Sequence, residues 1–454
     1  MSDQTAVAIV LAAGLGTRMA SARPKVLHEV AGLTMLDHVL GAAGAAGLSE
    51  QIVVTGPERD TVRAALAPVT RRTRFVVQDE RRGTGHAVLT ARAALDRHAG
   101  PVFVLYGDTP LIRPQTILAM GAALGPADLV ILAFTPDDPG QYGRVLRDAA
   151  GCVVAIREHA DASPEERRVA SCFSGLLAVA RAAHLELLEE LVADNAKGEL
   201  YLTDLVEIAR AHGLSCAAVE ADPVDVTGVN SRAELACAEL LMQERLRARA
   251  LAGGVTLVAP ETVYLSYDTA LARDVVIEPH VVFAPGVTVG EGALIRAFCH
   301  LEQAEIGAGA IVGPFARLRP GARIAANAHI GNFVEIKNAL IGAGAKANHL
   351  SYIGDATVGA GANIGAGTIT CNYDGFDKHR TEIGAGAFIG SNSALVAPVI
   401  IGEGAYVASG SVVTRDVEPG ALAIARGRQA NKPDWAERFR AQHHRPRKRA
   451  GRGK

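Results

Sequence analysis

Residues 306–336 read IGAGAIVGPFARLRPGARIAANAHIGNFVEI, and an aliphatic side chain recurs in this stretch at every sixth position. The recurring residues are Ile306, Val312, Leu318, Ile324, Ile330 and Ile336. A period of six matches neither the 3.6-residue period of an α-helix nor the alternation of a strand on a flat sheet. It is typical of a solenoid in which each hexapeptide forms one short strand and one corner, and three hexapeptides close a triangular coil. The stretch therefore predicts a parallel β-helix.

The same period occurs on both sides of this stretch. The preceding run is Ile277, Phe283, Val289, Ile295 and Leu301, and the following run is Ile383, Ile389, Leu395, Ile401, Val407 and Val413. The period slips after Ile336 and resumes at Ile341, and residues 371–380 interrupt it after Ile364. Loops extruded from a repeat scaffold commonly build binding sites, so the second break is a candidate site; a tolerated insertion is the alternative.

Length and composition limit the class of protein. A chain of 454 residues is long for one domain, so two or three folding units are expected. The formal net charge of −2 gives no global field that would attract nucleic acid or a membrane surface. Residues 6–13 lack a basic leader and no apolar run reaches a membrane span, so we expect a soluble cytoplasmic protein. The six cysteines show no C-x-x-C spacing and are expected to be reduced.

A glycine-rich turn follows the first apolar run. Residues 7–11 (VAIVL) read as a buried strand, residues 12–19 (AAGLGTRM) as a turn and helix start, and Pro24-Lys25 comes next. Bare backbone N–H groups and a helix N-terminus favour negative charge, so this turn predicts a phosphate cradle, which Arg18 and Lys25 strengthen. The turn is not the dinucleotide fingerprint, because Met19 replaces its third glycine, and no G-K-[ST] of a Walker A loop follows.

Strand and helix patterns alternate through the first half of the chain, which favours an α/β sheet. Residues 101–105 form one expected strand, and Tyr106-Gly107-Asp108 lies at its exit, where ligands of such sheets gather. Asp108 there is placed to hold Mg²⁺; a helix-cap or turn aspartate is the alternative. Ser231 and Glu234 then form a capping box that predicts a helix of about 20 residues, ended by Gly253-Gly254.

The L-A-A-G-x-G-T-R-M stretch followed by Pro24-Lys25 is similar to the signature of the sugar-nucleotide pyrophosphorylases. With the hexapeptide half, the chain resembles the family of bacterial bifunctional N-acetylglucosamine-1-phosphate uridylyltransferases/glucosamine-1-phosphate N-acetyltransferases, over nearly its whole length. The resemblance implies an α/β, Rossmann-like nucleotidyltransferase (pyrophosphorylase) domain over 1–232 and a linker helix over 233–253. It also implies a C-terminal left-handed parallel β-helix of hexapeptide repeats over 254–454, with a basic disordered tail from about 440.

Two reactions follow from the resemblance. The C-terminal site would acetylate glucosamine 1-phosphate with acetyl-CoA, and the N-terminal site would transfer UMP from UTP to N-acetylglucosamine 1-phosphate, releasing pyrophosphate. The product, UDP-N-acetylglucosamine, serves cell-wall precursors. Asp108 and Asn230 would hold Mg²⁺, and Arg18 and Lys25 would be catalytic through their charge. A homotrimer with acetyl-CoA sites between neighbouring coils is also implied, with no specific nucleic acid and no membrane as partners.

The resemblance assigns the nucleotide-sugar contacts to Leu11, Ala12, Ala13, Gly14, Lys25, Gln78, Gly83, Thr84, Tyr106, Gly107, Asp108, Gly143, Glu158 and Asn230. One departure stands out. The family has an asparagine facing the sugar in an N-[TS]-G stretch, and this chain has Phe173-Ser174-Gly175. Phe173 has no hydrogen-bonding group, so Ser174 or water replaces the contact, or sugar binding is weakened.

His349, in the stretch ANHLSY, is the expected general base of acetyl transfer, because a neutral imidazole can deprotonate an ammonium near pH 7. Glu335 is a candidate to orient it. By resemblance, Arg319 and Lys337 would bind the sugar phosphate, and Tyr352 and Asn363 the sugar. The acetyl-CoA groove would be lined by Ala366, Asn372, Tyr373, Ser391, Ser409 and Arg426.

There are two rival hypotheses, and the second comes from another class of protein. One is a single-activity pyrophosphorylase whose solenoid only serves assembly; it does not explain His349 within its motif. The other is a non-enzymatic regulatory subunit resembling the nucleotide-exchange subunits of translation initiation. That hypothesis predicts loss of Arg18, Lys25 or Asp108, and all three are present.

Overall fold

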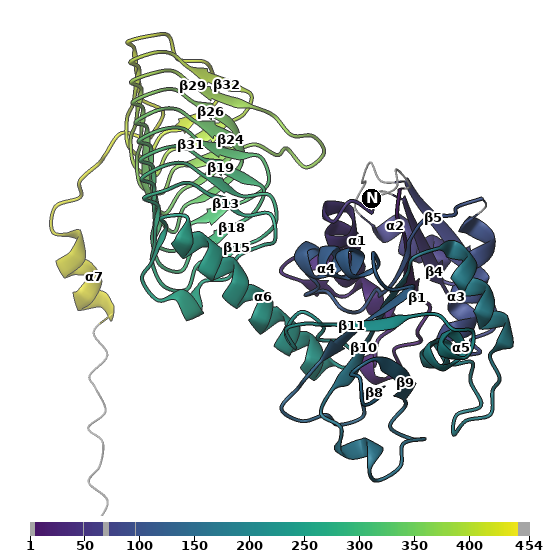
Figure 1. Cartoon of the computed structure of the whole chain (residues 1–454). Helices are drawn as coiled ribbons and strands as arrows, with labels where there is room; N and C mark the ends of the chain where they lie inside the picture. The colour runs from purple at the N-terminus through teal and green to yellow at the C-terminus, as the bar shows by residue number, and fades with distance from the viewer. Residues whose placement is uncertain (1–4, 49, 67–71, 96, 444–454) are drawn as a thin grey trace, which may run out of the picture. The chain divides into compact units, whose positions relative to one another are not determined.

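The computed structural model describes residues 5–48, 50–66, 72–95 and 97–443 (Figure 1). The chain divides into two compact units, one of Met1–Arg273 with Ile277–Val287 and one of Asp274–Val276 with Thr288–Lys454. Each unit is described here by itself.

The first unit is built on a mixed sheet whose main order is β11-β7-β10-β6-β1-β4-β5. The strands are β1 (Val7–Ala12), β4 (Glu50–Thr55), β5 (Arg72–Val77), β6 (Val102–Tyr106), β7 (Leu129–Phe134), β10 (Cys172–Val179) and β11 (Cys216–Glu220). All neighbours pair in parallel except β10, which is antiparallel to β6 and β7. Smaller strands are β8 (Arg144–Arg147) and β9 (Val153–Arg157), which extend the sheet, and the pair β2 (Glu29–Val30) and β3 (Leu33–Thr34).

Every residue of β1 is buried, because the strand contributes to a core on each face of the sheet. Ile9 packs in the cluster that contains Val88 of α3 (Thr84–Arg92). Val10 packs in the opposite cluster, with Val39 of α1 (Met35–Ala45). The remaining helices of this sheet are α2 (Arg59–Ala65), α4 (Pro114–Ala123) and α5 (Leu205–Ala211). The exits of β1 and β6 therefore meet at one edge of a sheet covered on both faces, where α/β proteins bind ligands.

A long helix, α6 (Arg232–Ala252), follows the sheet where the capping box predicts one. The Ser231 side chain accepts a hydrogen bond from the Glu234 N–H, as an N-cap does. The first hexapeptide strands come next: β12 (Thr256–Leu257), β13 (Ala270–Leu271), β14 (Val276–Ile277) and β15 (Val282–Phe283).

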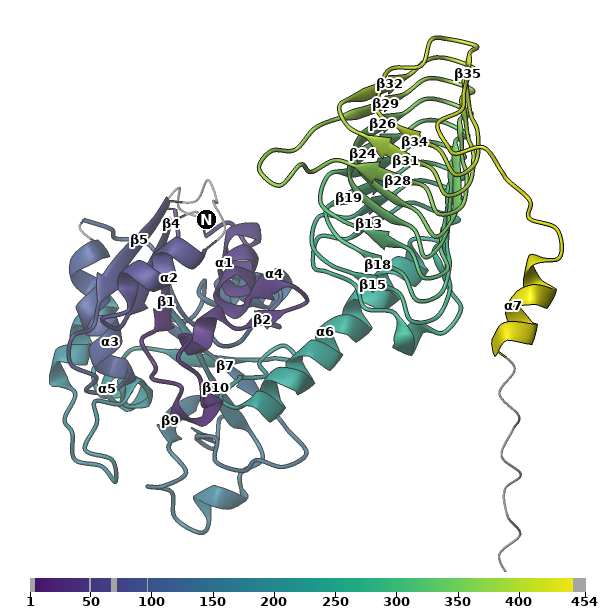
Figure 2. The same ribbon diagram turned by 180° about the vertical axis from the view of Figure 1, so that it is seen from behind.

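The second unit is a solenoid of short parallel strands, seen from behind in Figure 2. One face carries β17 (Leu294–Ile295), β20 (Ile311–Val312), β23 (His329–Asn332), β25 (Lys346–His349), β27 (Asn363–Ile364), β30 (Phe388–Ile389), β33 (Tyr406–Val407) and β35 (Leu422–Ala423). The others are β16 (Thr288–Val289), β18 (His300–Leu301), β19 (Ala304–Ile306), β21 (Arg317–Leu318), β22 (Ala322–Ile324), β24 (Glu335–Ile341), β26 (Tyr352–Val358), β28 (Ile369–Cys371), β29 (Thr381–Ile383), β31 (Ala394–Val396), β32 (Val399–Ile401) and β34 (Val412–Val413).

The register confirms the predicted coil. Thr288 pairs with Glu305 and Ile311 pairs with His329, so one coil takes 17 or 18 residues, which is three hexapeptides. Every aliphatic or aromatic residue of the three sixfold runs is buried. The interruption also lies where the sequence breaks its period, because β28 ends at Cys371 and a loop projects before β29 begins at Thr381 (Figure 1).

A last helix, α7 (Trp435–His443), follows the solenoid. It includes residues 440–443, for which the sequence predicts disorder; residues 444–454 of the basic tail lie outside the described residues. The helix is favoured by aromatic rings four residues apart, since Phe439 stacks on Trp435 at 4.8 Å and on His443 at 4.3 Å between ring centroids. Within the described ranges, no helix is both long and apolar enough to cross a membrane.

Candidate active sites

The glycine-rich turn connects β1 to a short 3-10 helix, Thr17–Met19. Gly16 has a φ of 61°, and a Cβ there would lie 2.7 Å from Cβ of Lys25, so only glycine fits. The backbone N–H groups of Gly14, Leu15 and Gly16 donate to no acceptor among the residues that the structure describes. The turn therefore presents free donors, as an anion cradle requires.

Lys25, Asp108 and Asn230 meet beside this turn. The buried Lys25 ammonium donates to Oδ1 of Asn230 at 2.9 Å and forms an ion pair with the Asp108 carboxylate. Asp108 follows β6, and its carbonyl accepts from the Val229 N–H at 2.9 Å. Asn230 is held by Glu234 in the first turn of α6, whose carboxylate accepts from the Asn230 N–H at 2.6 Å. Three distant segments thus converge on one ammonium.

The oxygens of Asp108 and Asn230 fit Mg²⁺ bound together with a nucleotide. Mg²⁺ commonly takes one or two protein oxygens and fills its remaining positions with water and phosphate. Among the described residues, no group of three or more His, Cys, Asp or Glu side chains could hold a metal by itself. In this structure the Lys25 ammonium lies between the two oxygens.

Other predicted residues surround this cluster. Gly107 donates its N–H to the Leu11 carbonyl at 2.9 Å, which joins β6 to β1 next to Ala12. Arg18 is exposed on the 3-10 helix and makes no ion pair with any described residue. Its guanidinium is therefore available to bind a ligand rather than engaged in a surface ion pair.

Tyr106, the last residue of β6, contacts the segments that carry Gly175 and Thr84. Its ring lies against Gly175, where a Cβ would come within 3.0 Å of the ring. Burial raises the pKa of the Tyr106 hydroxyl, against the opposing effect of its hydrogen bond with Thr84. Thr84 also accepts from the Leu202 N–H at 3.1 Å, and at Gly83 a Cβ would lie 2.5 Å from the Leu200 carbonyl oxygen.

The buried Gln78 side chain is largely used within the protein. Its amide nitrogen donates to the Gly83 carbonyl at 3.2 Å and lies 3.1 Å from Nδ1 of His86. Gln78 therefore shapes the Gly83–Thr84 turn, and its side-chain oxygen is the group left for a ligand.

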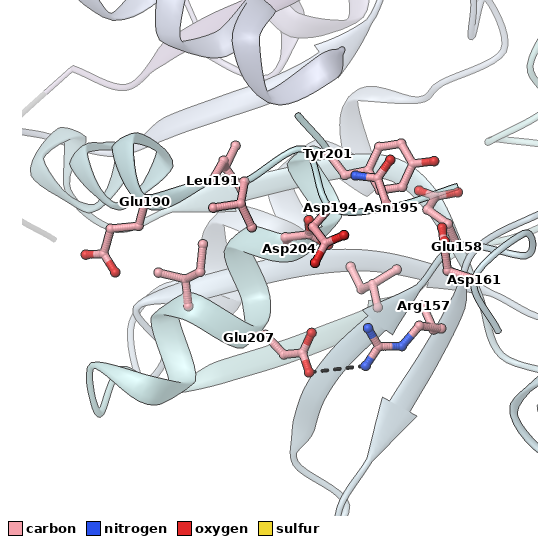
Figure 3. Close-up of a pocket in the computed structure, with 13 residues that line it drawn as sticks. Arg157, Glu158, Asp161, Glu190, Leu191, Asp194, Asn195, Tyr201, Asp204 and Glu207 are labelled. Atoms are coloured by element: carbon pink, nitrogen blue, oxygen red, sulfur yellow. Dashed lines mark hydrogen bonds and ion pairs between the residues drawn. The ribbon is translucent and has the colours of Figure 1, made fainter. Parts of the chain in front are cut away.

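Glu158 lines a polar cavity of about 280 Å³ (Figure 3). Burial raises the pKa of Glu158, although the Thr203 hydroxyl donates to it at 3.3 Å. Gly143 is adjacent, since a Cβ on it would lie 3.8 Å from the Glu158 carboxyl carbon. The buried Tyr201 hydroxyl has no hydrogen-bond partner among the described residues. These groups suit a ligand that carries hydroxyls.

Phe173 and Ser174, which stand where the family has its asparagine and the next residue, both contact other parts of the protein. Phe173 is buried in a hydrophobic cluster. The Ser174 hydroxyl donates to the Leu132 carbonyl at 2.8 Å and accepts from the Leu176 N–H at 3.2 Å. Of the two replacements predicted for the asparagine, Ser174 is thus already engaged by the backbone.

His349 ends β25 and is exposed at a corner of the solenoid. Its Nδ1 lies 2.6 Å from Oδ1 of Asn332, which is paired with it in register on the previous coil. An amide oxygen only accepts, so Nδ1 is the ring nitrogen that donates here, and Nε2 is the nitrogen left to face a ligand. Glu335 does not orient the imidazole as expected, because its carboxylate accepts from Arg319 at 2.8 Å. Asn332 is not among the residues predicted from the sequence, although it lies one coil before His349 and could have been found by counting back along the repeat.

One lysine and two amide side chains surround the Asp355 carboxylate. Lys337 Nζ lies 3.6 Å from this carboxylate, and Asn338 donates to it at 2.7 Å. Asn372, at the base of the projecting loop, is a second amide donor to the same carboxylate. Burial alone would raise the pKa of Asp355, but these hydrogen bonds and the Lys337 charge outweigh it and lower that pKa. Asp355 is a site residue that the sequence did not indicate.

This arrangement gives a prediction for pH-dependent stability. Because the folded-state pKa of Asp355 is lowered, its contribution is present above about pH 3.9, the ordinary carboxyl pKa, and is lost as the pH falls through the lower folded value. Asp355→Asn should reduce the free energy of unfolding by about 1–3 kcal/mol at pH 7. Thermal unfolding followed by circular dichroism measures this. Asp377→Asn, at an exposed loop carboxylate, is the control, and equal stabilities of the two variants would contradict the assignment.

The predicted acetyl-CoA residues follow one strip of successive coils. The Ala366 carbonyl accepts from Asn392 N–H at 2.7 Å, the Ser391 carbonyl from Gly410 N–H at 2.8 Å, and the Ser409 carbonyl from Arg426 Nη1 at 2.7 Å. The strip begins beside His349, whose carbonyl accepts from the Gly367 N–H at 3.3 Å. Tyr373 lies on the projecting loop, exposed, and donates to the Gly375 carbonyl at 2.6 Å.

The two predicted sugar contacts, Asn363 and Tyr352, lie on different faces of the solenoid within one chain. Asn363 lies on β27, on the face that contains β25. Tyr352 begins β26, on another face, and Lys337 lies on β24 beside it.

Comparison with known proteins agrees with this geometry. Residues 8–207 match the model of the MobA-like NTP transferase domain, and residues 303–338 and 380–415 match the bacterial transferase hexapeptide (six repeats). The protein named Bifunctional protein GlmU of Xanthobacter autotrophicus is 58% identical, over 98% of this chain and 100% of that protein. The proteins of that name in Azorhizobium caulinodans and Paramagnetospirillum magneticum are 57% and 54% identical, over 98% and 97% of this chain and 100% and 98% of their own lengths.

The chain belongs to the GlmU family. Membership confirms the predicted fold class, a nucleotidyltransferase domain with a mixed α/β sheet followed by a left-handed β-helix of hexapeptide repeats. It also confirms the prediction of a bifunctional transferase over the two rival hypotheses. The roles of individual residues are a separate question, which the geometry above addresses.

Proposed function

We propose that this protein carries out its two transfers at two separate sites and that the residues described above perform them. The C-terminal site acetylates glucosamine 1-phosphate, and the N-terminal site couples N-acetylglucosamine 1-phosphate to UMP from UTP. The observation that carries the proposal is the presence, in one chain, of two groups of residues. One is the Lys25–Asp108–Asn230 cluster beside free turn amides, and the other is His349, whose Nδ1 is engaged by Asn332 so that Nε2 is left to face a ligand. Release of thiol and of pyrophosphate from one sample tests it.

In uridylyl transfer, the sugar-phosphate oxygen attacks the α-phosphorus of UTP in line, and the bond to the β-phosphate oxygen breaks to release pyrophosphate. The N–H groups of Gly14, Leu15 and Gly16 hold phosphate oxygens, and Arg18 neutralises charge that grows on the leaving group. Mg²⁺, held by Asp108 and Asn230, would supply further neutralisation of the triphosphate. Lys25 then turns from these two oxygens toward phosphate. Glu158 and Tyr201 face the sugar hydroxyls.

In acetyl transfer, Nε2 of His349 takes a proton from the ammonium of glucosamine 1-phosphate. The neutral amine attacks the thioester carbonyl and the carbon–sulfur bond breaks. The imidazolium gives its proton to the leaving sulfur, so CoA leaves as thiol, and the new amide nitrogen loses its extra proton to solvent. Asn332 keeps the imidazole in the tautomer that can accept the proton. Arg319 and Lys337 bind the sugar phosphate, and the strip from Ala366 to Arg426 binds acetyl-CoA.

A homotrimer completes the C-terminal site in this proposal. The rings of Phe298, Phe315 and Phe333 stack from coil to coil at centroid distances of 4.8 and 5.1 Å, although 51%, 44% and 55% of each residue is exposed. Leu350, 62% exposed and next to His349, continues the column. An apolar column of this size on a surface favours a protein partner, and a second copy of this chain is the partner we propose.

The apolar column gives a direct test of assembly. We expect the double variant Phe315→Ser/Phe333→Ser to elute as a monomer and to lose at least about tenfold in thiol release, because hot-spot aromatics dominate interfaces. Pyrophosphate release should be unchanged. Size-exclusion chromatography with light scattering measures the mass. Ile400→Ser, at a residue 49% exposed on β32 outside the column, is the control. A double variant that remains a trimer would contradict the proposed interface.

The cellular setting belongs to the same proposal. UDP-N-acetylglucosamine is the activated sugar for cell-wall precursors, and the substrates from which the enzyme makes it are charged metabolites of the cytoplasm. We therefore place the enzyme there, with small molecules and its own copies as partners.

A further inference from the structure

Arg81 lies between β5 and α3 and is absent from the predicted site. Its Nε donates to the carbonyl of Ala13, in the glycine-rich turn, at 2.7 Å. Its Nη2 donates to both carboxylate oxygens of Glu58, at 3.2 and 3.3 Å. The side chain is 30% exposed, so most of it is packed between the turn and the start of α2.

The segment that carries Arg81 is fixed at both ends. Before it, the Gln78 N–H donates to the Thr55 carbonyl at 2.8 Å. After it, the Arg82 carbonyl accepts from the Leu200 N–H at 2.7 Å. Backbone hydrogen bonds on both sides of Arg81 therefore fix the segment from which its guanidinium extends to the turn.

The contact with Ala13 sets the direction of the next amide. In a planar trans peptide the carbonyl of one residue and the N–H of the following residue point in opposite directions. With the Ala13 oxygen turned toward Arg81, the Gly14 N–H must point away from Arg81. That N–H has no acceptor among the described residues, and a Cβ on Gly14 would lie 3.9 Å from Nζ of Lys25. Gly14 itself is therefore adjacent to the Lys25 ammonium.

We propose that Arg81 is a positioning residue that fixes the Ala13–Gly14 peptide so that the Gly14 N–H, and not the Ala13 oxygen, meets the nucleotide phosphate. A flipped peptide would turn a carbonyl lone pair toward an anion and remove one donor from the cradle. The inference rests on the uridylyl-transfer site proposed above and adds a residue that acts on it through the backbone.

Glu58 has a secondary part in this arrangement. It neutralises the guanidinium and lies beside Gly56, where an added Cβ would overlap both Nη2 of Arg81 and a carboxylate oxygen of Glu58. The absence of a side chain at Gly56 leaves room for the ion pair. The pair itself is exposed, with 46% of the Glu58 side chain accessible, and so contributes little by charge alone.

The test uses the full-length enzyme with Arg81→Met, Arg81→Lys and Glu58→Gln. Pyrophosphate release gives kcat and KM for UTP and, separately, for N-acetylglucosamine 1-phosphate, and titration calorimetry gives the Kd of Mg²⁺–UTP. We expect Arg81→Met to raise the KM and Kd for UTP about tenfold, because the variant loses one charge-assisted hydrogen bond. The KM for the sugar phosphate should not change. Arg81→Lys should stay within about threefold of wild type, because an ammonium can still donate to the Ala13 carbonyl. Glu58→Gln should stay within about twofold.

Several results would overturn the inference. These are an Arg81→Met variant within about twofold of wild type for UTP, equal losses in Arg81→Met and Arg81→Lys, or a Glu58→Gln variant as impaired as Arg81→Met. A drop in melting temperature with equal effects on both substrates would mean that Arg81 only supports the fold. A wild-type enzyme that neither binds UTP nor releases pyrophosphate would refute the proposed function itself. Thiol release, measured on each variant, shows that the chain is folded and assembled.

Discussion

Replacing His349 by alanine should lower kcat for thiol release by a factor of about 10² to 10⁴. The amine of glucosamine 1-phosphate is an ammonium near neutral pH, and Nε2 of His349 is the nitrogen that we expect to deprotonate it, because Asn332 engages the other ring nitrogen. Pyrophosphate release should not change. The measurement is the steady-state rate of thiol formation with glucosamine 1-phosphate and acetyl-CoA.

Two further variants separate catalysis from general damage. Asn332→Ala should cause a smaller loss, about tenfold, because the imidazole remains but its tautomer is no longer fixed. His300→Ala, at an exposed histidine on β18 of the same solenoid, should match wild type. A His349→Ala enzyme that keeps thiol release within about threefold of wild type would remove the general-base assignment.

Replacing Asp108 by alanine should reduce pyrophosphate release about 10³-fold, because the metal that neutralises the triphosphate loses its only carboxylate among the proposed ligands. Thiol release should be unaffected. Lys25→Met should also slow pyrophosphate release, but for a different reason. In the structure its ammonium lies between the oxygens of Asp108 and Asn230, so its removal frees the place that a metal would take.

Metal binding distinguishes these two variants. In titrations with Mn²⁺ as the probe, followed by electron paramagnetic resonance, Lys25→Met should bind the metal at least as tightly as wild type. Asp108→Ala should bind it at least about tenfold more weakly. Glu58→Gln serves as the control carboxylate, since it contacts neither oxygen. Unchanged Mn²⁺ affinity in Asp108→Ala would exclude this carboxylate as a metal ligand.

The solenoid is the part of the fold that the sequence predicts most completely. Its core is one aliphatic residue per hexapeptide, and each of these positions, from Ile277 to Val413, is buried. A short repeat makes the three-dimensional contact local, because each coil meets the next after 17 or 18 residues. The break at residues 371–380 could be located for the same reason. The helix α7 was not predicted, since its aromatic residues stack only on one another and bury nothing.

The sites were less predictable, because their geometry depends on contacts between distant segments. Lys25, Asp108 and Asn230 could be grouped only through the resemblance to a known family; neither spacing nor periodicity brings them together. Asn332 and Asp355 could have been found by counting one coil back or forward from a predicted residue. Arg81 leaves no signal of this kind, since its role depends on which backbone carbonyl its guanidinium reaches. The position of Ser174, engaged by the Leu132 carbonyl, likewise required the structure.

The central claim is that one chain carries two separable transferase sites, and a split assay on a single purified sample tests it most directly. Thiol release is followed with glucosamine 1-phosphate and acetyl-CoA, and pyrophosphate release with N-acetylglucosamine 1-phosphate, UTP and Mg²⁺. We predict both signals in the wild type, with His349→Ala abolishing only the first and Asp108→Ala only the second. Thiol release without pyrophosphate would point to Phe173 as a disabling change in the sugar site. Pyrophosphate without thiol release would contradict the two-site account and leave the solenoid as a scaffold.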